Sequence, residues 1–161
     1  MPKPGDIGIV KRHPGLLDDI ISDVTNSPYV HATFFINETD VIEAWWSGVR
    51  VYTYPPGYLD VFTPKTPLTQ DQVAKGMDYA KSKLHTGYDF PALVGILLEK
   101  WFGWLGIKRN MFASKYRVIC SELVADIYRE MGYTDLPENE DCSVTPADLA
   151  TWDEVIYSGT N

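Results

Sequence analysis

The sequence predicts an α+β fold, in which an antiparallel β-sheet of about four to six strands packs against helices. Two features lead to this prediction. From residue 31 to residue 63, β-type segments follow one another with connections too short for parallel pairing. Beyond residue 69, apolar residues recur every three or four positions, as in amphipathic helices. A chain of 161 residues suits one domain, so we expect a single domain over residues 1–161.

The clearest β signal lies at residues 31–36 and 41–46, which are rich in aromatic and aliphatic side chains. The turn-forming residues 37–40 between them predict a hairpin. Further strands are expected at residues 7–10, 48–54, 59–63 and 155–157.

The predicted helices are recognised by their ends and their spacing. Thr69 is a suitable N-cap for a helix over residues 70–84. Gly132 is a suitable terminator for a helix over residues 120–131. Helical spacing predicts further short helices at residues 15–25, 92–105 and 146–150.

Charge and cysteine content argue against several classes of protein. The chain has 22 acidic and 14 basic residues, a net charge of −8, whereas nucleic-acid binding needs a surplus of Lys and Arg. Two cysteines are too few for a disulfide scaffold or a four-cysteine zinc site. The sequence shows neither a signal peptide nor an apolar run of membrane-spanning length. We expect a cytoplasmic protein without a cofactor, of bacterial or phage origin.

Cys120 is the first candidate for chemistry, because it opens the helix predicted over residues 120–131. Free N–H groups and the positive end of the helix dipole favour a thiolate there. The backbone amides of Cys120 and Ser121 are placed to hold a developing oxyanion. The alternative is a buried structural cysteine. Cys142 lies among acidic residues, which raise the pKa of a thiol, so we expect no catalytic role for it.

A cysteine nucleophile usually needs a base, and the sequence offers three histidines. His13 lies in a predicted turn and His85 near the end of a predicted helix, where solvent contact is the simpler explanation. His31 opens a strand with apolar neighbours, so the fold should hold it in place. It is either the base or a hydrogen-bonded histidine at a strand end.

Glu43, on the return strand of the same hairpin, is the candidate that would orient the imidazole. A two-residue turn would put Glu43 and His31 on opposite faces of the sheet, whereas a three-residue loop or a bulge would put them on one face. The sequence leaves this open, together with the alternative of an exposed strand carboxylate. The bulky neighbours of Glu43 favour burial, and therefore a partner.

Three segments resemble the circularly permuted papain-like amidases, a branch of the NlpC/P60 superfamily related to the lecithin–retinol acyltransferase group. PGDIGIV at 4–10 is similar to the opening strand of that superfamily. SPYVHATFFI at 27–36, followed by VIEA at 41–44, is similar to its histidine hairpin, and YRVICSELV at 116–124 to its nucleophile helix. Histidine precedes cysteine here, as in the permuted branch. TPADLA at 145–150 is similar to a closing segment of the YiiX/YaeF-like subset.

The resemblance implies a cysteine hydrolase with Cys120 as nucleophile, His31 as base and Glu43 as orienting carboxylate. It also implies that Tyr88 and Tyr116 line the cleft, although core packing explains these two residues equally well. The same resemblance implies a permuted papain-like arrangement of the sheet and helices.

Two departures from the family pattern stand out. Thr33 occupies a position where glycine is common, and it would narrow the cleft. Residues 101–110 read as an insertion. A zinc site formed by the candidate residues is a further alternative, but none of the usual closely spaced ligand pairs occurs, and we expect no metal.

Residues 90–105 are apolar nearly all round, and basic residues follow them. This segment is either a buried helix with a homodimer contact or a surface that meets a membrane or an acyl chain.

The expected function is hydrolysis of a peptide or isopeptide amide, such as a cell-wall peptide, through an acyl-enzyme. Two alternatives remain at this point. One is a lipid-directed thioesterase, phospholipase or acyltransferase that uses the same three residues. The other is a catalytically inactive binding module.

Overall fold

The computed structural model describes residues 1–11, 27–45, 47–86, 120–137 and 144–161. Several predictions fall outside these residues and stay predictions. They concern the helices at 15–25 and 92–105, the 90–105 surface, the insertion at 101–110, and His13, Tyr88, Tyr116 and Cys142.

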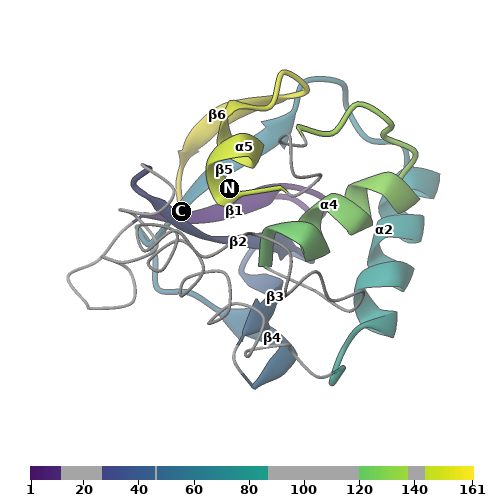
Figure 1. Ribbon diagram of the computed structural model, residues 1–161, viewed down its shortest axis with the longest axis horizontal. Coiled ribbons are helices and arrows are strands. Elements are labelled where there is room, and N and C mark those ends of the chain that lie inside the picture. The colour runs from purple at the N-terminus through teal and green to yellow at the C-terminus, as the bar shows by residue number, and fades with distance from the viewer. Residues whose placement is uncertain (12–26, 46, 87–119, 138–143) are drawn as a thin grey trace, which may run out of the picture.

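The predicted α+β class is confirmed, because the described residues form one six-stranded sheet with helices packed against it (Figure 1). The strands lie in the order β4-β3-β2-β1-β5-β6, and every neighbouring pair is antiparallel. They span β1 (Ile7–Lys11), β2 (Tyr29–Phe35), β3 (Asp40–Trp45), β4 (Gly48–Thr53), β5 (Leu59–Pro64) and β6 (Val155–Thr160).

Each predicted strand corresponds to one of these six, with small differences at the ends. The largest difference is in β6, which was predicted to end at residue 157. It continues to Thr160, because Gly159 and Thr160 pair with Val61 and Asp60 of β5. Backbone pairing thus extends this strand through Ser158 and Gly159, which give no β signal in the sequence.

The described helices are α2 (Gln70–Ser82), α4 (Cys120–Glu130) and α5 (Pro146–Thr151). Thr69 caps α2 as predicted and forms a capping box with Gln72. Thr145 forms the corresponding box with Asp148 at the start of α5. Beyond the end of α4, Gly132 adopts a φ of 95°, which favours glycine and stops the helix.

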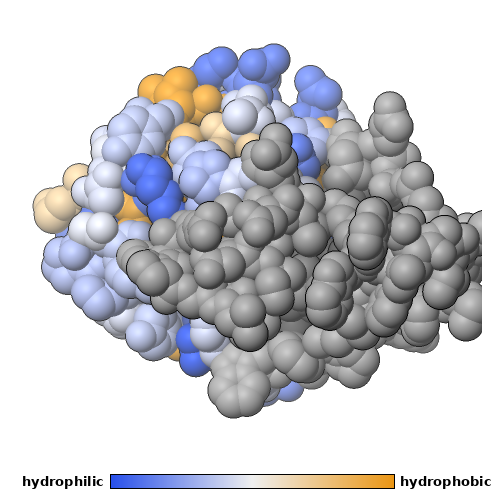
Figure 2. All heavy atoms as spheres, turned by 60° about the vertical axis from the view of Figure 1, so that its left-hand side comes forward, coloured by the Kyte–Doolittle hydropathy of each residue, from blue (hydrophilic) through white to orange (hydrophobic). Residues whose placement is uncertain are grey.

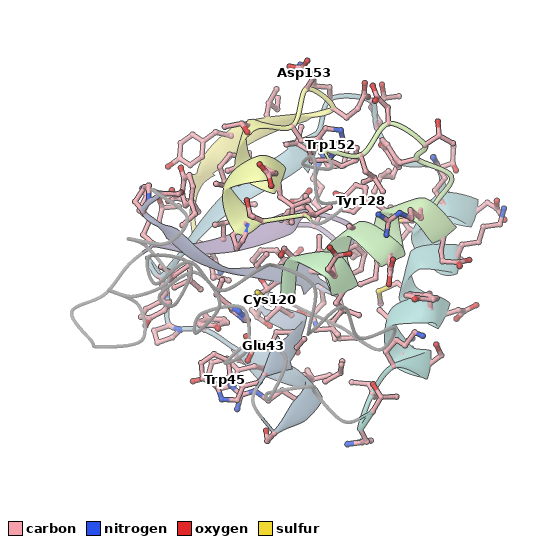
Figure 3. The ribbon with its side chains drawn as sticks, in the orientation of Figure 1. Glu43, Trp45, Cys120, Tyr128, Trp152 and Asp153 are labelled. Atoms are coloured by element: carbon pink, nitrogen blue, oxygen red, sulfur yellow. The ribbon has the colours of Figure 1, made fainter. Side chains whose placement is uncertain are left out.

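The main core lies between the sheet and the helices. Tyr128 of α4 is at its centre and is fully buried against the rings of Phe34, Tyr133 and Trp152. Its hydroxyl donates to the carbonyl oxygen of Gly5 at 2.6 Å, which ties α4 to the segment before β1. This contact helps to set where the first residue of α4 lies against the sheet (Figures 1 and 3).

A second buried cluster lies on the opposite face of the sheet. It contains Val10, Val30, Phe35, Val41, Leu59 and Val61, with Tyr54 and Tyr58 packed against it. The described surface in Figure 2 is mostly hydrophilic, with small separate hydrophobic patches. Among the described residues, the exposed large apolar side chains other than Met1 belong to the edge strands β4 and β6. Within the described ranges, no helix has the length and apolar character needed to cross a bilayer.

Candidate active site

Cys120 is the first residue of α4, and only 7% of its surface is exposed. The buried face of α4, which includes Leu123, Val124 and Ile127, holds the helix against the sheet. The start of a helix leaves backbone N–H groups without helical partners. Cys120 therefore combines burial with a helix N-terminus, at the end of α4 that Figure 3 shows beside β2 and β3.

The pairing of β2 and β3 stops short beside Cys120. Only Phe34 with Ile42 and Phe35 with Val41 are paired, although both strands continue. Alternate residues of a strand direct their N–H groups to opposite sides, and Phe35 N–H bonds Asp6 on the β1 side. The N–H of Ala32 is therefore directed to the β3 side, where it donates to the sulfur of Cys120 instead of to a strand.

His31 and Glu43 meet on one face of the sheet. The N–H of Ile36 donates to the carbonyl oxygen of Asp40 at 2.9 Å, so residues 37–39 form a three-residue loop. This loop decides the register that the sequence left open, because it puts Glu43 on the same face as His31. Nε2 of His31 donates to Oε2 of Glu43 at 2.8 Å. The Glu43 side chain is fully buried, so the alternative of an exposed strand carboxylate was wrong.

The second nitrogen of His31 is directed to Cys120. Since Nε2 is occupied by Glu43, Nδ1 remains for the hydrogen bond between His31 and the cysteine sulfur. The ring also lies edge to face with Trp45, at 5.4 Å between ring centroids. Cys120, His31 and Glu43 thus form one continuous hydrogen-bonded chain.

Glu43 has two further partners that the sequence reasoning missed. Arg50 donates to Oε1 through both Nε and Nη2, at 2.8 and 2.7 Å. The hydroxyl of Tyr54 donates to Oε2 at 2.7 Å. A usable signal was present, because residues 50, 52 and 54 alternate along the strand after a tight turn and so share the face of Glu43.

The electrostatics favour a thiolate–imidazolium pair. Burial raises the pKa of Cys120, but the His31 charge, its hydrogen bond and the amides of Ala32 and Ser121 outweigh burial and lower it. Burial lowers the pKa of His31, whereas Cys120 and Glu43 together raise it to about 10. Burial raises the pKa of Glu43, and its hydrogen bonds to His31, Tyr54 and Arg50 lower it overall. Each charge is therefore stabilised by its neighbours.

Ser121 contributes to this site through its backbone rather than its side chain. Its N–H donates to the Cys120 sulfur, while its buried hydroxyl donates to the carbonyl oxygen of Val144 at 2.6 Å. Thr33 was expected to narrow the cleft. That remains a prediction; the hydroxyl of Thr33 donates to the carbonyl oxygen of Gly8 at 3.1 Å, on the β1 side of β2.

A metal does not fit the described residues well. They contain no group of three or more His, Cys, Asp or Glu side chains arranged to hold an ion. Both oxygens of Glu43 already accept two hydrogen bonds each. At this site the described residues would leave only the Cys120 sulfur and one nitrogen of His31, which is fewer than the three protein ligands of a typical zinc site.

The likeness of this chain to known proteins is one of structure and not of sequence. No family model matches the sequence, and no match was found among curated proteins. Among solved structures, the chain is similar to the metalloprotein YiiX, DUF1105, from Escherichia coli O157:H7. The identity is 16%, with 99% of this chain and 98% of that chain covered and a TM-score of 0.49.

Proposed function

We propose that the protein is a cysteine hydrolase that cleaves an amide through an acyl-enzyme, with Cys120 as nucleophile, His31 as acid and base, and Glu43 as the residue that orients His31. The observation that carries the proposal is the hydrogen-bonded chain from the Cys120 sulfur through His31 to Glu43. A nucleophile, a base and a third group that orients the base are what acyl transfer by a thiol requires.

The first half of the proposed reaction transfers an acyl group to sulfur. The Cys120 thiolate attacks the amide carbonyl carbon, and the carbonyl oxygen becomes an oxyanion. Backbone N–H groups at the start of α4, which have no partner within the helix, stabilise that charge. The imidazolium of His31 gives its proton to the leaving nitrogen, the C–N bond breaks, and an amine departs from a thioester at Cys120.

The second half releases the acyl group. His31, now neutral, takes a proton from water, and the resulting hydroxide equivalent attacks the thioester. The C–S bond breaks, a carboxylic acid leaves, and the proton on His31 restores the thiolate–imidazolium pair. Glu43 keeps Nε2 protonated throughout, so Nδ1 is the nitrogen that exchanges protons with sulfur and water.

The choice of an amide substrate rests on the resemblance to permuted papain-like amidases, in which the histidine hairpin precedes the nucleophile helix. The same three residues would serve a lipid-directed thioesterase or acyltransferase. The segment that would distinguish the two, residues 90–105, lies outside the described residues. Peptide and isopeptide amides, including cell-wall peptides, are therefore the first class to test.

The test compares two electrophilic probes on the wild-type chain and on Cys120→Ala. One probe carries a peptide and the other a long acyl ester, each with a thiol-reactive group. We expect the peptide probe to label wild type and to leave Cys120→Ala unlabelled. Exclusive labelling by the acyl-ester probe would instead assign the site to lipids.

The rate of iodoacetamide reaction at Cys120 as a function of pH separates an enzyme from an inactive binding module. Trypsin cleavage after Arg117 and Arg129 places Cys120 and Cys142 in different peptides, so mass spectrometry can follow each thiol. We expect Cys120 to react with an apparent pKa well below that of free cysteine, about 8.5. An ordinary value would refute the proposed function.

A further inference from the structure

Arg50 contacts the proposed catalytic chain only through Glu43. Both of its N–H contacts, from Nε and Nη2, go to Oε1 of the carboxylate. The other oxygen, Oε2, accepts from His31 and Tyr54. The carboxylate is thus divided between a guanidinium on one oxygen and the imidazole and a phenol on the other.

The fold holds Arg50 firmly in this position. Arg50 on β4 is the register partner of Glu43 on β3. Its guanidinium lies between two rings, 4.7 Å from the centroid of Trp45 and 4.6 Å from that of Tyr52. Trp45 in turn contacts the ring of His31. Stacking on aromatic faces limits the freedom of a guanidinium and stabilises its charge.

The charges of the site balance only when Arg50 is counted. The thiolate of Cys120, the imidazolium of His31 and the carboxylate of Glu43 sum to one negative charge in a buried region. The side chain of Glu43 is fully buried, while that of Arg50 is 34% exposed. An uncompensated buried charge is costly, and a carboxylate in that position takes up a proton more readily.

We propose that Arg50 is a positioning residue of the proposed hydrolase. Arg50 acts on His31 through Glu43: it holds Oε1 and balances the charge of the carboxylate, so that Oε2 stays aimed at Nε2 of His31. The inference rests on the proposed function. Arg50 itself touches neither the sulfur nor the imidazole nitrogens among the contacts of the described residues.

Replacement of Arg50 should therefore change the pKa of the Cys120 thiol through three linked effects. Oε1 of Glu43 loses both of its donors, so the carboxylate is no longer held with Oε2 aimed at Nε2 of His31. A displaced carboxylate stabilises the imidazolium of His31 less. The thiolate of Cys120 then loses part of its counter-charge, and the pKa of the thiol rises.

The test measures the pH dependence of Cys120 alkylation by iodoacetamide in Arg50→Gln and Arg50→Lys. We expect the apparent thiol pKa to rise by about one unit in Arg50→Gln. Arg50→Lys keeps the positive charge but loses the two-nitrogen contact and the stacking, so it should raise the apparent thiol pKa by a smaller amount. Lys75→Gln is the matched control, since it removes a cation from an exposed pair with Asp71 on α2 and should change nothing.

A double-mutant cycle tests whether Arg50 acts through Glu43. The titratable and charged groups that face Glu43 are His31 from β2, Arg50 from β4 and Tyr54 after β4, and Cys120 of α4 faces His31. If Arg50 acts through the carboxylate, Arg50→Gln should cause no further shift in a Glu43→Gln background. A merely structural role would leave the two effects additive.

The outcomes separate the inference from the proposed function. An ordinary thiol pKa in the wild type would refute the proposed function. A low wild-type pKa that Arg50→Gln leaves unchanged or lowers further would refute the role of Arg50 alone, as would additive effects in the cycle. Thermal melting checks that each variant folds. If Arg50→Gln does not melt cooperatively, the smaller upward shift in Arg50→Lys decides the question.

Discussion

The two edges of strand β2 differ sharply. Toward β1, the strand is paired from Phe34 to Tyr29, with a bulge near its start. Toward β3, it is paired at Phe34 and Phe35 alone. On the β1 edge, the backbone N–H and carbonyl groups of β2 take part in hydrogen bonding within the sheet. On the β3 edge, the N–H of Ala32 bonds the Cys120 sulfur, and the side chains of His31 and Glu43 meet beside it.

This difference shows how one strand serves both stability and chemistry. The paired edge gives β2 a fixed position, so that His31 and Ala32 are held without help from β3. The unpaired edge leaves room and hydrogen-bonding capacity for the start of α4. Substitutions on the two edges should therefore have different consequences: loss of reactivity on the β3 side, and loss of stability on the β1 side.

The largest effect is expected on the β3 side, from His31→Asn. Removal of the imidazole takes away the acid, the base and the counter-charge of the thiolate, and should lower amide hydrolysis roughly 10²- to 10⁴-fold. The pH profile of alkylation at Cys120 checks the same point. In the wild type, the alkylation rate should rise with pH around a thiol pKa that is lower than that of free cysteine. The rate should then stay constant until His31 loses its proton near pH 10.

His85→Asn is the matched control for this prediction. His85 is exposed and has a φ of 63°, a conformation that asparagine tolerates. Hydrolysis and alkylation should be unchanged by it. If His31→Asn kept the wild-type alkylation profile, the thiolate would not depend on the imidazole, and the functional contrast between the two edges would fail.

The next effect concerns the stability that Glu43 contributes as an anion. Glu43→Gln replaces charged hydrogen bonds and should lower the free energy of unfolding by about 2 kcal/mol at neutral pH. The pKa of Glu43 is lowered in the folded protein from its usual 4.5. Its contribution is therefore present above pH 4.5 and is lost as the pH falls through the lowered value.

Urea unfolding at pH 7 and at pH 3 measures this contribution. The difference in free energy of unfolding between wild type and Glu43→Gln should shrink at the lower pH. A difference that stayed constant or grew would mean that the carboxylate is not stabilised by its ion pairs with His31 and Arg50.

A comparable effect on the β1 side is expected from Gly8→Ala. The added Cβ would lie 2.4 Å from Oγ1 of Thr33 and 3.0 Å from the ring of Phe35. Overpacking of this kind should cost about 1–3 kcal/mol in the free energy of unfolding. Because the clash is on the paired edge, the apparent pKa of Cys120 should stay as in the wild type.

Thr33→Ala provides a check on the cause of that loss. It removes the hydroxyl that Gly8→Ala would meet first, so the double variant should lose less stability than the sum of the two single variants. Additive losses, or a changed thiol pKa in Gly8→Ala, would show that the two edges of β2 are not independent.

The smallest effect is expected from Ser121→Ala, which separates the role of the Ser121 hydroxyl from that of its backbone N–H at the start of α4. The variant loses a buried hydrogen bond to Val144 and should unfold more easily by about 1 kcal/mol. It keeps the backbone N–H that serves the sulfur, so the pH profile of alkylation should not move. A raised thiol pKa would mean that the hydroxyl supports the thiolate as well.

Much of the fold could be predicted from local pattern. The hairpin around residues 37–40, the capping box at Thr69 and the stop at Gly132 depend on neighbours in sequence, and each is found where it was expected. Local pattern made Cys120, His31 and Glu43 candidates, and the resemblance to permuted papain-like amidases gave them their expected roles. The strand ends were less predictable, because β6 continues through Gly159 and Thr160 by pairing with a strand about a hundred residues away.

The amino-acid sequence was sufficient for the α+β class and, with the resemblance that its motifs carry, for the three residues proposed to act together. It was not sufficient for the register of Glu43, since one extra loop residue reverses the face of a strand and the sequence permits either loop. Nor did it indicate that β2 and β3 part beside α4, or that Arg50 and Tyr54 bond Glu43. Those features arise when segments far apart in the chain pack together, and only then does a free backbone amide or a buried carboxylate acquire its partner.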